Sequence, residues 1–246
     1  MLILLLACSP EKTDSDETEP VADSGDTFDD TGELIDTTDC MEEGEGLYEV
    51  KEGVGAPYWV STVPGGEEPT ATIVYLPGGG GSRGSARSGF LAFFGAHHDF
   101  VTRYRVLAPF SAQDTFPEEY ERTLDIVAEA RRCWGTGPVH LVGHSAGNAA
   151  AALMAADTSP WRSLSLAPGS FSSAVQGSDF DAMFAAHDLY IGVGELDTDW
   201  RAYSEGLAAD LSGRGVDVTL DVWTGTGHVP EPDFDPALLH SVLDAR

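Results

Sequence analysis

From residue 71 onward, short apolar runs alternate with segments of helical periodicity. The apolar runs are bounded by Gly or Pro and contain many β-branched side chains, which is typical of buried strands. Strands connected through helices pair in parallel, so the alternation predicts an α/β fold with a mostly parallel sheet and helices on both faces. The strands predicted in this way are Ala71 to Leu76, Arg105 to Ala108, Val139 to Gly143, Ser163 to Ala167 and Leu189 to Val193.

Further elements complete the predicted fold. Two earlier strands, Leu47 to Val50 and Tyr58 to Val63, give the sheet an antiparallel start. Only about 30 residues separate Ala167 from Asp197, so we expect no large lid domain between them. The remaining predictions are a last strand over Asp217 to Trp223 and helices over Pro117 to Cys133, Ala146 to Ala156, the segment with Trp200, Tyr203, Leu207 and Leu211 on one face, and Pro236 to Leu243.

The segment before the first strand lacks folding material. Between Glu11 and Glu45 there are 15 acidic residues and one base, Lys12. Such a stretch buries too little apolar surface to offset its chain entropy. We therefore expect a disordered acidic linker over residues 9–46 and a folded domain over residues 47–246.

The N-terminus is apolar but too short to span a bilayer. Its sequence, Met-Leu-Ile-Leu-Leu-Leu-Ala-Cys, is typical of the apolar part of a signal peptide. Leu5-Leu6-Ala7-Cys8 resembles the bacterial lipobox. This resemblance implies a signal peptide over residues 1–8, a lipid on Cys8, and a lipid-anchored location in the bacterial cell envelope, periplasmic or on the outer surface. The alternative is an apolar strand that joins the core.

Charge and cysteine content exclude several classes of function. The net charge of −28 and the absence of any Lys/Arg cluster argue against nucleic-acid binding. There is no Cys-x-x-Cys pair and no His-x-x-x-His helix, so no metal site is expected. If Cys8 is acylated, Cys40 and Cys133 remain for a disulfide in an oxidising compartment, with two unpaired thiols as the alternative.

A glycine-flanked serine follows one predicted strand directly. Gly143-His144-Ser145-Ala146-Gly147 is a G-x-S-x-G motif, in which the serine occupies a sharp strand-to-helix turn and larger flanking side chains would collide with neighbouring elements. A second match, Gly80-Gly81-Ser82-Arg83-Gly84, lies several residues beyond its strand. Only Ser145 stands directly between a strand and a helix, so it is the predicted nucleophile and Ser82 is a loop residue.

The glycine-rich loop after Leu76 brings out a resemblance to the α/β-hydrolase family. Tyr75-Leu76-Pro77-Gly78-Gly79-Gly80-Gly81 follows the third strand, where the family carries a His-Gly-Gly-type loop; Pro77 stands in place of that histidine. The family's oxyanion hole uses N–H groups of this loop and of the residue after the serine. The resemblance implies Gly79 and Ala146 as donors, with Gly80 as the next candidate.

The same resemblance implies an acid and a base after the serine, in the order Ser, Asp or Glu, His. Gly194-Glu195-Leu196-Asp197 leaves a strand as the family's acid position does, with Asp199 and Glu195 as competitors. His228 and His240 are the two histidines after Asp197, and His228 lies in a loop after the last strand whereas His240 lies in a predicted helix. Of the other histidines, His144 is expected to shape the pocket or pack, and His97 and His98 to lie in a surface loop.

These residues imply a serine esterase or lipase. A serine at its ordinary pKa is a poor nucleophile, so it needs a base and a carboxylate that orients the base. The expected reaction is hydrolysis of a small-molecule or polymeric carboxylic ester through an acyl-enzyme on Ser145, without metal or organic cofactor. The alternatives are a serine peptidase or thioesterase on the same fold, or a non-catalytic surface binding protein that retains it.

Overall fold

The computed structural model describes residues 27–28, 34–35, 46–50, 57–61, 69–95, 103–110, 120–135, 137–156, 161–169, 184, 186–231 and 234–244. The chain divides into two compact units, residues 1–35 and residues 36–246. In the first unit, β1 (Thr27–Phe28) pairs antiparallel with β2 (Leu34–Ile35). This short pair lies inside the stretch predicted as a linker, and the predicted boundary at residue 46 stays a prediction.

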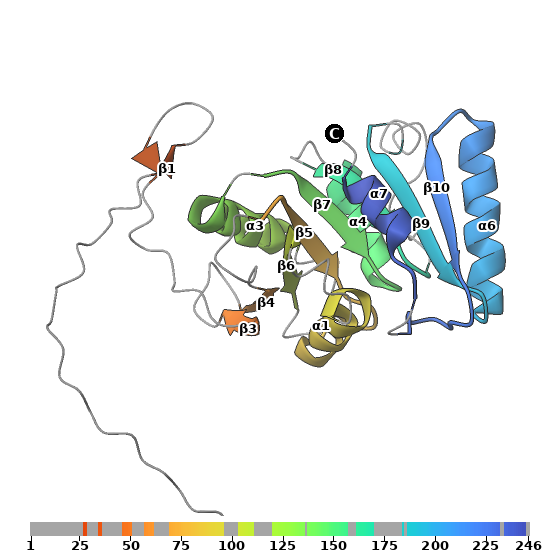
Figure 1. Cartoon of the computed structure of the whole chain (residues 1–246), viewed down its shortest axis with the longest axis horizontal. Helices are drawn as coiled ribbons and strands as arrows, with labels where there is room; N and C mark the ends of the chain where they lie inside the picture. Colours follow the sequence, from red (N-terminus) through yellow and green to blue (C-terminus); the bar gives the residue numbers. More distant parts are fainter. Residues whose placement is uncertain are drawn as a thin grey trace, which may run out of the picture. The chain divides into compact units, whose positions relative to one another are not determined.

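The second unit is built around one sheet of eight strands in the order β10-β9-β8-β7-β5-β6-β4-β3 (Figure 1). The six strands from β10 to β6 run parallel, whereas β4 pairs antiparallel with both β6 and β3. The strands are β3 (Leu47–Val50), β4 (Tyr58–Ser61), β5 (Ala71–Leu76), β6 (Tyr104–Pro109), β7 (Val139–Gly143), β8 (Trp161–Leu166), β9 (Asp188–Gly194) and β10 (Val218–Trp223).

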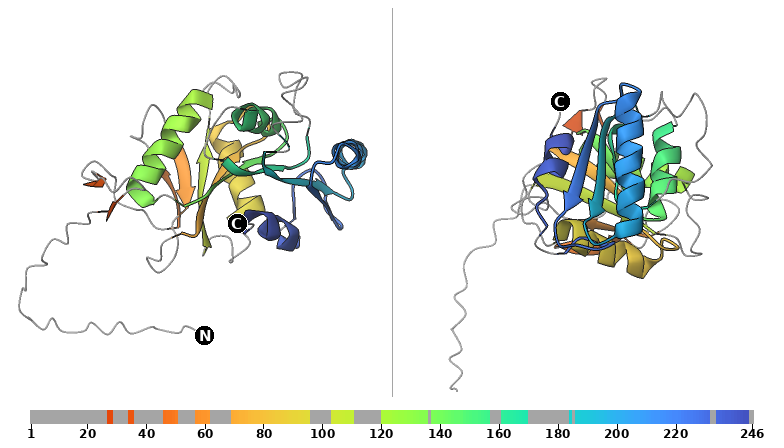
Figure 2. Two further views of the ribbon diagram at one scale, coloured as in Figure 1. Left: turned by 90° about the horizontal axis from the view of Figure 1, so that it is seen from above. Right: turned by 90° about the vertical axis from the view of Figure 1, so that its right-hand side faces the viewer.

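Helices cover both faces of this sheet (Figure 2). On one face the core is shared with α3 (Tyr120–Trp134), α4 (Gly147–Ala156) and α6 (Thr198–Gly213). On the other face it is shared with α1 (Arg83–Phe90), the π-helical turn η2 (Leu91–Gly95) and α7 (Ala237–Leu243). The sheet is therefore the middle layer of three.

Burial on both faces explains why the strands are continuous apolar runs rather than alternating ones. Every residue of β5 is buried. Val74 and Leu76 belong to the core under α4, whereas Ile73 and Tyr75 belong to the core under α1. Successive side chains of a strand point to opposite faces, so one strand supplies both cores.

The fold class predicted from the sequence is confirmed: the sheet is mostly parallel, its first strands are antiparallel, and helices flank it. Predicted and observed bounds differ at the ends, as for β4, which stops at Ser61, and α4, which starts at Gly147. The sequence of α1 shows no clear helical periodicity of apolar residues, because this segment is rich in Gly and Ser.

The connection from β8 to β9 comprises residues 167–187, which leaves no room for a separate lid domain. None of the helices in the described part of the chain has the length and apolar composition of a bilayer-crossing segment. Cys8 and Cys40 lie outside the described residues. Cys133 is disulfide-bonded, and its pairing with Cys40 stays a prediction.

Candidate active site

The turn between β7 and α4 holds Ser145 in a strained backbone conformation. Its φ is +53°, the only positive value at a non-glycine residue among those described. This left-handed conformation costs roughly 1–2 kcal/mol in a residue with a Cβ, so surrounding contacts must hold it. Two main-chain hydrogen bonds do so: His144 donates to the Leu76 carbonyl at 3.0 Å and Ser145 to the Pro168 carbonyl at 2.9 Å. The turn is therefore held by the last residue of β5 on one side and by the loop after β8 on the other.

Close backbone contacts explain why glycines surround this serine. A Cβ at Gly147 would lie 2.1 Å from the Leu76 carbonyl oxygen. A Cβ at Gly78 would lie 2.9 Å from the Ser145 Cβ and 3.1 Å from His144 Nδ1. The glycine-rich loop after β5 therefore passes directly over the serine, where a side chain would displace it.

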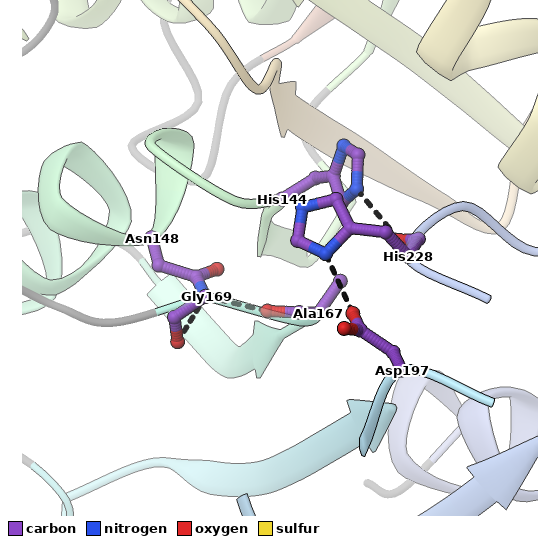
Figure 3. A network of polar contacts seen from close by, with 6 residues as sticks. All are labelled: His144, Asn148, Ala167, Gly169, Asp197 and His228. Carbon is purple, nitrogen blue, oxygen red and sulfur yellow. Dashed lines mark hydrogen bonds and ion pairs between the residues drawn. The ribbon is translucent and has the colours of Figure 1, made fainter. Parts of the chain in front are cut away.

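Asn148 stabilises the other side of the turn from the first turn of α4 (Figure 3). Its buried Nδ2 donates to the carbonyl oxygens of Ala167 at 2.5 Å and Gly169 at 3.1 Å. These two carbonyls flank Pro168, which accepts the Ser145 N–H. One amide side chain thus shapes the loop that supports the serine backbone.

Asp197 and His228 meet in a short hydrogen bond. His228 Nδ1 lies 2.6 Å from Asp197 Oδ2, and the Asp197 side chain is 13% exposed against 37% for His228. Asp197 is the N-cap residue of α6, yet its side chain makes no capping hydrogen bond. Its carboxylate is turned to the histidine instead, which leaves Nε2 of His228 free to face another group.

Contacts between the loops after β9 and β10 produce this meeting. The Leu196 N–H donates to the Thr226 carbonyl at 2.8 Å, and the Gly225 N–H donates to Glu195 Oε2 at 3.0 Å. A Cβ at Gly194 would lie 2.0 Å from the Gly227 carbonyl oxygen, so the two backbones touch. Because β9 and β10 are parallel neighbours, their carboxyl ends bring the acid and the histidine to the same edge of the sheet.

A pocket of about 310 Å³ joins Ser145 and His228. No hydrogen bond between their side chains is present in the described structure. The residues lining the pocket are Gly78, Gly79, Ser85, Ser88, Gly89, His144, Ser145, His228 and Val229.

The predicted oxyanion donors differ in their relation to this pocket. Gly79, with φ +63°, lines it beside Ser145. Ala146 follows the serine at the N-terminus of α4, and its N–H has no hydrogen-bond acceptor within the described part of the chain. Gly80 lies one residue beyond Gly79 and does not line the pocket.

Two buried histidines, one on β7 and one next to it, have pKa values below the ordinary value. Burial lowers the pKa of His140 to about 4, with the charge of Arg162 acting in the same direction. Burial also lowers the pKa of His144 to about 4. His140 bonds the Ser163 hydroxyl at 2.7 Å, away from the pocket, whereas His144 lines the pocket.

The other candidates for the serine, the acid and the histidine lie elsewhere in the structure. Ser82 is the N-cap of α1, where its side chain accepts the Ser85 N–H. Asp199 stands in the first turn of α6, and His240 stacks near Tyr104 with ring centroids 5.8 Å apart. His97 and His98 lie outside the described residues. Within the described residues, no cluster of three or more His, Cys, Asp or Glu side chains could hold a metal ion.

Several residues that line the pocket or support the turn of Ser145 could not be found by reasoning from the sequence. Gly78 was named only as part of its loop, and Asn148 carried no signal beyond standing near a helix start. Ser85, Ser88 and Val229 line the pocket because α1 and the loop after β10 fold over it. Short-range sequence patterns do not report such long-range contacts.

Comparisons with known proteins identify the fold. No protein-family model matches the sequence, and no curated protein matches it. Solved structures do: TT1662 from Thermus thermophilus has a TM-score of 0.60 at 18% identity, covering 83% of this chain and 100% of that one. Poly(aspartic acid) hydrolase-1 from Sphingomonas sp. KT-1 has a TM-score of 0.52 at 15% sequence identity, and the match covers 76% of this chain and 94% of that one. A hyperthermophilic esterase from the archaeon Pyrobaculum calidifontis has a TM-score of 0.52 at 18% sequence identity, and the match covers 76% of this chain and 78% of that one. Together with the strand order, these similarities show that the chain has the α/β-hydrolase fold.

The contact at Gly194 yields a first prediction. We expect Gly194→Ala to lower the free energy of unfolding by about 1–3 kcal/mol, because the added methyl must displace the Gly227 backbone. Gly206→Ala is the matched control: it lies inside α6 with nothing within 4 Å of the added Cβ, and should stabilise by about 0.5–1 kcal/mol. Urea denaturation measures both. Equal midpoints for Gly194→Ala and the unchanged protein would contradict the contact.

The neutral histidines yield a second prediction. Their pKa values of about 4 lie below the ordinary value of 6.5, so the unfolded chain binds their protons first. Stability is full above pH 6.5 and falls as pH drops toward 4, by up to roughly 1.4 kcal/mol per pH unit for each histidine. Urea denaturation from pH 7.5 to 4.5 should show a shallower loss for the double variant His140→Gln, His144→Gln. An unchanged pH slope would refute the assignment.

Proposed function

We propose that this chain is a serine hydrolase that cleaves carboxylic esters through an acyl-enzyme on Ser145. The observation that carries the proposal is the hydrogen bond between Asp197 and His228 at the rim of the pocket that contains Ser145. These residues come from the ends of three separate strands, β7, β9 and β10. The strained φ of Ser145 supports it too, because strain of this kind concentrates at functional sites.

In the proposed reaction, His228 acts as the base. Its Nε2 takes the proton of the Ser145 hydroxyl as Oγ attacks the ester carbonyl carbon. The bond between the carbonyl carbon and the alkoxy oxygen of the ester then breaks, and the proton on Nε2 passes to that oxygen, which leaves as the alcohol. A water molecule loses its proton to the same nitrogen, attacks the acyl-enzyme, and releases the acid as the proton returns to Ser145. Asp197 holds Nδ1–H throughout and stabilises the imidazolium.

The N–H groups of Gly79 and Ala146 are the proposed donors to the oxyanion, with Gly80 as the further candidate. Gly79 is placed beside the serine by the loop after β5, and Ala146 stands at the positive end of α4. The pocket volume of about 310 Å³ is at the lower end for ligand sites, which favours small acyl groups. Of the three solved structures with this fold reported above, one is named as a hydrolase and another as an esterase, which supports the proposal.

The triad yields a third prediction, measured with a short-chain aryl ester. Ser145→Ala and His228→Ala should each lower kcat by about three to six orders of magnitude, and the double variant should lose no more, because the two residues act as a unit. Asp197→Asn should lower it less, though still by orders of magnitude, because the amide favours the wrong imidazole tautomer.

Ser82→Ala and His240→Ala serve as controls. They replace the serine of the second G-x-S-x-G match and the other late histidine, and both should retain most of the rate. A fluorophosphonate probe should label the protein only when Ser145 is present. A protein that resists the probe and leaves esters intact would be a binding protein, and loss of activity in Ser82→Ala alone would place the nucleophile in the glycine-rich loop.

For localisation, the proposal is export as a lipoprotein anchored through Cys8. Its support is Leu5-Leu6-Ala7-Cys8 followed by the acidic stretch from Glu11 to Glu45. A single acyl chain binds membranes weakly, so stable anchoring requires the several chains of a lipidated N-terminal cysteine. The acidic segment would then act as a spacer between membrane and enzyme.

The fourth prediction tests this anchor in a bacterial host. The protein should partition into the detergent phase, and intact-mass analysis should show a chain that begins at Cys8 and carries lipid. Cys8→Ser should move it to the aqueous phase without altering esterase activity, since the site lies in residues 78–229. A detergent-phase fraction that is the same for both proteins, or a mature chain that retains Met1, would refute the anchor.

A further inference from the structure

A chain of hydrogen bonds runs from β5 through the serine turn to the loop of His228. The Tyr75 hydroxyl lies 3.3 Å from His144 Nδ1, and His144 Nε2 lies 3.1 Å from the main-chain carbonyl oxygen of His228. Figure 3 shows His228 contacted twice, by Asp197 at its ring and by His144 at its carbonyl. The side chain next to Ser145 thus holds the backbone of the histidine that faces it.

Only one arrangement of protons satisfies both bonds. A carbonyl oxygen can only accept, so Nε2 of His144 must carry the hydrogen. The ring is neutral at pH 7, because burial lowers its pKa to about 4. Nδ1 therefore holds a lone pair and accepts the Tyr75 O–H, whose pKa burial raises well above its ordinary value.

Packing fixes the two rings as well. Gly89 of α1 makes room for the tyrosine hydroxyl, since a Cβ there would lie 1.9 Å from that oxygen. Phe93 contacts both rings, with centroid distances of 5.6 Å to Tyr75 and 5.1 Å to His144. The hydrogen-bond chain is therefore preorganised before any substrate binds.

We propose that His144 is a positioning residue, whose ring ties the main chain of His228 to the turn that carries Ser145. The inference rests on the proposed function. Asp197 fixes the rotation of the His228 ring, whereas His144 fixes the position of its backbone. Residue 144 is covalently next to the nucleophile, so the tie sets the spacing of nucleophile and base directly. A displacement of about 1 Å at such a site can cost two orders of magnitude in rate.

A ring that only fills space would behave differently, and substitutions separate the two cases. His144→Phe keeps a planar ring but loses both hydrogen bonds, and should lower kcat by about 10- to 100-fold with little change in KM. His144→Gln keeps an N–H that can reach the carbonyl and an oxygen that can accept from Tyr75, and should recover most of that loss. Tyr75→Phe removes one bond and should have the smaller effect.

His140→Phe is the matched control, because His140 is a buried histidine of the preceding strand with a lowered pKa but bonds Ser163 instead. It should lower stability yet leave kcat near the unchanged value. Full kcat in His144→Phe, or equal losses in His144→Phe and His144→Gln, would overturn the proposal.

Hydrogen exchange of the loop 225–231 separates this inference from the proposed function, because it needs no turnover. We expect faster amide exchange there in His144→Phe than in His140→Phe. If the unchanged protein lacked esterase activity and probe labelling while this difference persisted, the proposed function would fail and the tie would stand. If activity were present and loop exchange were equal in the two variants, the tie would fail and the proposed function would stand.

Discussion

The fastening of the serine turn to both neighbouring strand ends is the constraint on which the rest of the site depends. Main-chain N–H groups of His144 and Ser145 reach carbonyls on opposite sides, at Leu76 and Pro168. Such bonds form only if the backbones approach closely, which requires glycine at Gly78 and Gly147. The strained φ of Ser145 then follows from its surroundings, and the glycine-rich loop after β5 and helix α4 are brought beside it as a consequence.

The parallel sheet brings residues that are distant in the sequence close together. Strands β7, β9 and β10 are parallel and nearly adjacent, so residues that follow their carboxyl ends collect at one edge although more than 80 positions separate Ser145 from His228. Each loop is short and bonded to its neighbour, as Leu196 is to Thr226. Asp197 Oδ2 and His228 Nδ1 can therefore approach to 2.6 Å.

Sequence reasoning succeeded where a physical requirement is local. Apolar runs between Gly and Pro predicted the strands, since burial on both faces demands them. The strand–Gly–helix context likewise predicted a turn at Ser145, where the structure has one, whereas the role of Ser145 as nucleophile stays a prediction. It failed where the requirement is set by distant parts of the chain. Asn148 supports a loop about 20 residues away, and the link between Tyr75 and His144 depends on the absence of a side chain at Gly89 on a third element. For His144 the sequence indicated a role in shaping the pocket or in packing, but it offered no means to identify the two hydrogen-bond partners.

Asp197 occupies the N-cap of α6 without capping it. A capping carboxylate is worth about 1 kcal/mol to a helix, so the side chain serves the histidine at the expense of the first turn of α6. Two uses thus compete for one functional group, and any change that releases the carboxylate from His228 frees it to rotate back onto the helix. While the Asp197 carboxylate holds His228, the backbone N–H groups at the start of α6 receive no hydrogen bond from this side chain.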